Sequence, residues 1–212
     1  MSKADIDCIK ADDLVWRCND CNTDRRKSMR FEAEAGEKNR QLKNKVQKLE
    51  ERLEDMEQYS RGNCLEIHGI PQEPNEDVLT VVKDVGKALD IDVSDSMIDT
   101  CHRLGKRENK GKNYHAGIIV KFVRRMDKEE FLRKRRVKRN LNLSHINKPG
   151  GEVIYVNESL SPERRRLLAL AKAAKREKGY TFLWIRNGKI FLRKEEEAPV
   201  IVVTRQEHLS KL

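Results

Sequence analysis

Apolar residues between positions 35 and 61 recur at alternating steps of three and four, the 3.5-residue repeat of a left-handed coiled coil. The seam positions are Ala35, Asn39, Leu42, Val46, Leu49, Leu53 and Met56. A single buried Asn, here Asn39, fixes the register of such pairs at a cost in stability. The pattern predicts a coiled coil over 35–61 that self-associates as a dimer or a trimer. The alternative is one amphipathic helix that lies on its own domain.

The segment 62–147 alternates between the patterns of strands and helices. Period-two alternation predicts a strand over 64–70, and further strands are expected over 97–104, 116–123 and 141–146. Helical spacing of apolar residues predicts helices over 78–89 and 127–137. The order strand-helix-strand-strand-helix-strand is the split βαβ arrangement that RNA-recognition sheets share with many enzymes and protein-binding domains. We therefore expect an RRM-like domain over 62–147.

The segment 152–212 predicts a small domain with a helix and a hairpin. Ser161 is a good N-cap, Pro162 follows at the first helical position, and Gly179 lies just past the end of the helix. Two strands then flank Asn187-Gly188, the strongest short hairpin signal, and 200–203 adds a third strand. The overall expectation is an α+β chain with an N-terminal coiled-coil helix.

A two-residue turn fixes the register of the hairpin, and the pairing separates the side chains into two kinds. One face is aliphatic and is expected to be the core. The other face carries two rings and three cations: Trp184, Arg186, Lys189, Phe191 and Arg193. Rings flanked by cations form a platform on which single-stranded bases stack. The alternative is that both rings are buried under the helix at 161–178 or under another domain.

Charge is unevenly distributed along this chain of 212 residues, whose net charge is +10. Residues 103–139 carry 15 Lys and Arg against 4 Asp and Glu, and residues 164–194 carry 11 against 1. The first block ends in a run that suits phosphate contact or nuclear import: Arg133, Lys134, Arg135, Arg136, Lys138 and Arg139. The second begins with Arg164, Arg165 and Arg166 at a helix start, where the dipole disfavours cations. We interpret these three as ligands of a phosphate.

Several classes of protein are excluded by the same sequence. Apolar runs such as 200–203 fall far short of the ~20 residues that a membrane span needs. Five cysteines do not suit a disulfide scaffold, so we expect a reducing compartment, the nucleus or the cytoplasm. Nucleotide-binding glycine loops, nucleophile elbows and metal-ligand spacings with carboxylates are missing. We expect no enzymatic activity, no catalytic residue, no cofactor and no metal.

Two sets of residues resemble known protein families. Residues 59–71, 101–105 and 118–122 resemble the RNA-binding region of first-open-reading-frame proteins of LINE-type retrotransposons. Residues 157–163 and 179–194 resemble the C-terminal domain of the baculovirus few-polyhedra (FP) protein and its insect retroelement relatives. The resemblance implies an oligomer that binds single-stranded RNA or DNA as a chaperone or packaging protein. The alternative is a protein-interaction adaptor whose basic blocks serve solubility or import.

The first 34 residues resemble something else. Residues 16–21 are similar to the last turn of a PHD finger, and Cys8 lies near an earlier ligand position. One tetrahedral zinc needs four ligands, and this segment supplies three Cys. We expect a truncated remnant that is disordered and holds no zinc alone; the alternative is a zinc site completed by a partner chain.

Overall fold

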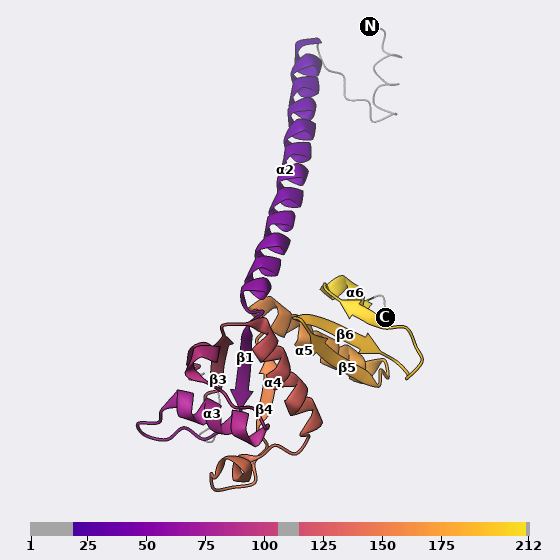
Figure 1. Cartoon of the computed structure of the whole chain (residues 1–212). Coiled ribbons are helices and arrows are strands. Elements are labelled where there is room, and N and C mark those ends of the chain that lie inside the picture. Colours follow the sequence, from indigo (N-terminus) through magenta and orange to yellow (C-terminus); the bar gives the residue numbers. More distant parts are fainter. Residues whose placement is uncertain (1–18, 106–114, 211–212) are drawn as a thin grey trace, which may run out of the picture. The chain divides into compact units, whose positions relative to one another are not determined.

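The computed structural model describes residues 19–105 and 115–210 (Figure 1). The chain divides into two compact units, 1–53 and 54–212. Helix α2, Asn19–Ser60, spans the boundary between them. It begins within the segment 1–34 that we expected to be disordered, because ion pairs one turn apart such as Arg30–Glu34 favour a helix there. Cys8 and Cys18 lie outside the described residues.

The predicted helix over the heptad segment is confirmed. Along it the aliphatic seam residues lie open to solvent, with exposed fractions between 51% and 67%. These residues are Leu42, Val46, Leu49, Leu53 and Met56. The structure contains one chain, so the self-association of this seam stays a prediction.

The second unit begins with an antiparallel four-stranded sheet in the order β2-β3-β1-β4. Its elements are β1 Cys64–His68, α3 Val78–Ala88, η1 Asp95–Met97, β2 Ile98–Arg103, β3 Ile118–Phe122, α4 Arg125–Val137, η2 Leu143–Ile146 and β4 Tyr155–Glu158. Leu65 and Ile67 of β1 pack with the apolar sides of α3 and α4 in one core. The residues that alternate with them in β1, Glu66 and His68, therefore lie on the opposite face of the sheet.

The order of strands and helices is the one predicted, but its last strand lies elsewhere. Residues 143–146 form the short helix η2, and β4 pairs with β1 through Glu66↔Asn157 and His68↔Tyr155. Leu143 and Ile146 are nevertheless buried in the core. The apolar pattern of this segment thus predicted the burial of its side chains correctly, but the predicted strand is a short helix. The last strand of the first sheet ends at Glu158, beyond residue 147, where the sequence analysis ended this segment.

The C-terminal part contains α5 Pro162–Glu177, β5 Phe182–Arg186, β6 Lys189–Arg193, β7 Ile201–Val203 and α6 Gln206–Ser210, with the strands in the order β5-β6-β7. The predicted hairpin register is confirmed at every pair, including Trp184↔Phe191. Ser161 Oγ accepts a hydrogen bond from the N–H of Arg164, which confirms it as the N-cap of α5. Across from this helix, Ile190 and Leu192 complete the aliphatic core.

The structure is thus mixed α+β, with a long N-terminal helix and two antiparallel sheets. Among the described helices, none is long and apolar enough to cross a membrane.

Candidate nucleic-acid interface

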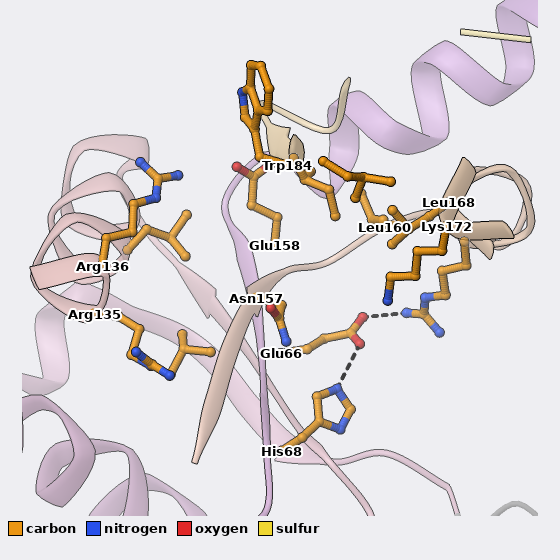
Figure 2. A pocket seen from close by; sticks show the side chains of 15 residues that line it. Glu66, His68, Arg135, Arg136, Asn157, Glu158, Leu160, Leu168, Lys172 and Trp184 are labelled. Atoms are coloured by element: carbon orange, nitrogen blue, oxygen red, sulfur yellow. Dashed lines mark hydrogen bonds and ion pairs between the residues drawn. The ribbon is translucent and has the colours of Figure 1, made fainter. Parts of the chain in front are cut away.

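A groove of about 460 Å³ lies between the first sheet and the C-terminal part of the second unit (Figure 2). Arg135 and Arg136 reach it from α4, and Lys172 reaches it from α5, with β4 lying between the two helices. Trp184 of β5 stands at its upper rim in this view. The fold therefore brings the two basic blocks and one ring of the predicted platform to a single opening.

Glu66 is a buried charge in this groove, with an exposed fraction of 7%. It forms an ion pair with Arg165, and it accepts hydrogen bonds from Ser159 Oγ at 2.9 Å and His68 Nε2 at 3.3 Å. Burial alone would raise the pKa of Glu66, but the His68 hydrogen bond, the charge of Arg165 and the Ser159 hydrogen bond outweigh it and lower the pKa. The carboxylate is thus ionised and already neutralised by its neighbours.

Two cations of the groove have no such compensation. In the described part of the chain no carboxylate pairs with Arg136 or Lys172. Arg135, by contrast, donates to the carbonyl oxygens of Lys138 at 2.9 Å and Ile154 at 3.3 Å. Arg136 and Lys172 are therefore the groove cations most available to an external anion.

The rest of the run on α4 is divided in the same way. Arg133 pairs with Glu130 at 3.2 Å, and Lys138 donates to the Ala88 carbonyl oxygen at 2.6 Å. Lys134 and Arg139 have no ion-pair partner within residues 19–105 and 115–210. Some cations of this run thus make contacts within the protein, and others have no ion-pair partner among the described residues.

Each of the three arginines at the start of α5, interpreted from the sequence as phosphate ligands, has a carboxylate partner in the protein. Arg164 is 8% exposed and donates to Glu54 Oε1 at 3.2 Å, to Asp55 Oδ1 at 2.8 Å and to the Gly188 carbonyl oxygen at 3.1 Å. Arg166 pairs with Glu163 one turn earlier. Arg164 is enclosed by its partners, so we leave it out of the proposed phosphate contacts.

The ring pair of the hairpin is half-buried and preformed. Trp184 and Phe191 stack with ring centroids 5.5 Å apart and an interplanar angle of 10°. Arg193 lies over Phe182 at 4.8 Å, and Arg186 and Lys189 at the turn are exposed. Helix α5 packs on the aliphatic face instead, so the predicted separation of the two faces is confirmed and the rings are not covered by that helix.

Sequence reasoning missed Lys172 and the Glu66 network. Lys172 follows Arg165 by two helical turns, so the two share a face of α5, and that spacing was a usable signal. The partners of Glu66 come from β1, the 159 loop and α5, and no local pattern joins them.

The described residues contain no group of three or more His, Cys, Asp or Glu side chains that could hold a metal ion. Burial raises the pKa of the Cys64 and Cys101 thiols, which keeps both protonated at neutral pH. These two cysteines therefore do not resemble activated nucleophiles.

Comparison with known proteins gives matches in the second unit. Residues 62–156 match the family described as Baculovirus FP protein domain 1, and residues 161–212 match Baculovirus FP protein domain 2. A search of the curated proteins gave no match. The two matched stretches follow one another and together cover more than half of the chain. Residues 62–156 and 161–212 therefore carry baculovirus FP protein domains 1 and 2.

Proposed function

We propose that this protein binds single-stranded RNA or DNA along the groove and across the ring face of the hairpin. The observation that carries the proposal is the convergence of Arg136, Lys172 and Trp184 on one opening from three different elements. Two of these groups are cations that pair with no carboxylate among the described residues, and the third is a ring that belongs to a stacked pair. This is the combination that sequence-tolerant single-strand binding requires.

The two kinds of group have different tasks. Arg136 and Lys172 hold phosphates, and each phosphate that they neutralise releases condensed counterions, which makes affinity depend on salt. Trp184 and Phe191 offer their faces to bases at about 1–3 kcal/mol for each stacked base. Paired bases in a duplex cannot reach a ring in this way, so we expect a preference for single strands.

We further propose that the first domain is an RRM-like split βαβ unit, on the basis of its strand order β2-β3-β1-β4. The sheet positions on β1 and β3 that face away from its helices include Glu66, His68, Ile119 and Lys121, and no Phe, Tyr or Trp. RNA-recognition motifs stack bases on aromatic residues of this face. The two central strands therefore offer no ring to a base, and we expect the base contacts on the hairpin instead.

The exposed seam of α2 supports a coiled-coil oligomer, dimer or trimer. Several copies of a weak binding surface on one strand raise the apparent affinity without any new contact. We propose on this basis, and on the retroelement resemblance, a nucleic-acid chaperone or packaging protein that acts in the nucleus or cytoplasm. In the variant Leu42→Asp/Leu49→Asp, we expect monomers by light scattering and weaker binding to long strands.

The proposal is tested by fluorescence anisotropy of labelled single-stranded RNA, single-stranded DNA and duplex DNA at two salt concentrations. We expect tighter binding to the single strands and steep weakening with salt. Trp184→Ala should lose about tenfold or more in affinity. The control Met126→Ala changes a side chain that is 80% exposed and lines neither the groove nor the hairpin face. The absence of binding by the unaltered protein at low salt would contradict the proposal and favour the protein-interaction adaptor.

A further inference from the structure

A second cavity, of about 670 Å³, lies where the last turn of α2 meets the start of α4 and the turn of the hairpin. Six cations and three carboxylates line it. The cations that matter below are Arg125, Arg186 and Lys189, and Tyr59 is the aromatic residue of the lining. None of the functional assignments made from the sequence includes Tyr59 or Arg125.

The carboxylates of this second cavity are all engaged by the protein. Glu158 accepts hydrogen bonds from the backbone N–H groups of Asn187 at 3.1 Å and Gly188 at 2.7 Å. Glu129 accepts a hydrogen bond from Lys128, and Asp55 accepts one from Arg164. Within the described ranges, Arg125, Arg186 and Lys189 form no ion pair with any carboxylate, although all three are exposed to solvent.

Tyr59 and Arg125 form a stack at the mouth of this cavity. The Tyr59 side chain is 71% exposed, and the guanidinium of Arg125 lies 4.3 Å from the centre of its ring. Arg125 is fixed there because it donates to Asn63 Oδ1 at 3.2 Å and to the Tyr59 carbonyl oxygen at 3.4 Å. Gly62 permits this close approach, since a Cβ at that position would lie 2.9 Å from a guanidinium nitrogen. An exposed ring beside a cation that the protein holds in place suits a base and its phosphate.

The second cavity continues the path of the groove. Glu158 lines both, and β5 passes from one to the other, with Trp184 in the groove and Arg186 in the second cavity. These two side chains project from the same face of β5, about 7 Å apart along the strand. A strand of nucleic acid that stacks on Trp184 therefore meets Arg186 at the next step.

We infer that the second cavity binds the continuing part of the same single strand, a phosphate between Arg125, Arg186 and Lys189 and a base on Tyr59. This inference rests on the proposed function and assigns it a second subsite. The ligand class is a phosphodiester with an unpaired base. The cations alone would bind any anion, whereas the exposed ring of Tyr59 favours a ligand that also carries a flat base.

The test is anisotropy with a 24-nucleotide labelled RNA and the full chain. Tyr59→Ala should weaken binding about tenfold. Tyr59→Phe, which keeps the ring, should bind more tightly than Tyr59→Ala. Met126→Ala, beside Arg125 but outside both cavities, is the matched control. Tyr59 is not a seam position of the heptad, so light scattering should report the same oligomer for every variant.

Trp184→Ala serves to separate the two claims. Loss of binding in both Trp184→Ala and Tyr59→Ala supports one continuous path. If Trp184→Ala loses binding and Tyr59→Ala binds as the unaltered protein does, the inference is overturned and the proposed groove stands. If only Tyr59→Ala loses binding, the groove proposal fails and so does the continuous path. A 4-thiouridine RNA should also crosslink to the peptide that contains Tyr59, and a crosslink confined to other peptides would contradict the inference.

Discussion

The two arginine-rich stretches of this chain look alike in sequence and differ in their surroundings. On α4, Arg136 reaches an open groove without any carboxylate partner in the described residues. On α5, Arg164 is enclosed by Glu54, Asp55 and the Gly188 carbonyl oxygen. The first arrangement leaves a positive charge for an outside anion. The second uses the charge to hold the end of α2 against the start of α5.

The difference shows that a basic cluster is available to an external anion only where the fold places no carboxylates beside it. The helix dipole disfavours all three arginines of α5, and that cost requires compensation. The compensation comes from carboxylates of the same chain, Glu54 and Glu66 among them. Charge counts along the sequence cannot separate this case from that of α4.

The largest effect is expected when the enclosed arginine is removed. Arg164→Ala leaves Glu54 without its cation and the Gly188 carbonyl oxygen without its donor. Breaking one side of a mostly buried pair costs about 3 kcal/mol. Urea unfolding should show a decrease of that order in the free energy of unfolding. A stable Arg164→Ala protein with lost RNA affinity would reverse the assignment of this residue.

A smaller effect, on binding and not on stability, is expected on α4. Arg136→Gln should lower the slope of log affinity against log salt by about 0.7, the value for one phosphate contact on a single strand. Arg176→Gln removes the same charge from an exposed position of α5 that lines neither cavity. Equal slopes in the two variants would show that only net charge matters, contrary to a local contact.

The Glu66 network should appear in the pH dependence of stability. Because the folded protein lowers the pKa of Glu66, the stabilisation is present above the usual value of 4.5 and is lost as pH falls through the folded pKa. The variant Glu66→Gln has no carboxylate at this position, so it lacks this pH-dependent stabilisation at every pH. The difference in unfolding free energy between the two proteins should therefore shrink below about pH 4.5. A difference that stays constant down to pH 3 would argue against an ionised Glu66.

The smallest effect is expected for Arg166→Ala. Arg166 is exposed, and its partner Glu163 lies one turn away on the same helix. Such pairs contribute about 0.5 kcal/mol or less. Thermal unfolding and RNA affinity should both stay close to those of the unaltered protein. A loss comparable to that of Arg164→Ala would place Arg166 in a role that its contacts do not explain.

Features set by neighbouring residues could be predicted from the sequence. The hairpin register followed from Asn187-Gly188, because a two-residue turn determines every pair beyond it. The start of α5 followed from Ser161 and Pro162 for a similar reason. Period-two alternation then separated the ring face from the aliphatic core.

Features set by distant partners could not be predicted. Glu54 and Arg164 lie 110 positions apart, and only the folded chain brings them together. The fourth strand was misplaced because Leu143 and Ile146 are buried from a short helix, and their apolar pattern alone does not distinguish that helix from a strand. The position of β4 also determines where the groove lies. The sequence therefore could not predict that Arg136 and Trp184 line the same groove.

The most direct test of the central claim is the fluorescence of Trp184 in a Trp16→Phe protein, in which it is the single tryptophan. Titration with single-stranded RNA should quench this fluorescence to saturation, and added salt should reverse the quenching. The same concentration of duplex DNA should have a much smaller effect. Unchanged Trp184 fluorescence under conditions where anisotropy reports bound RNA would contradict the account, because the strand would then lie away from the groove and the hairpin face.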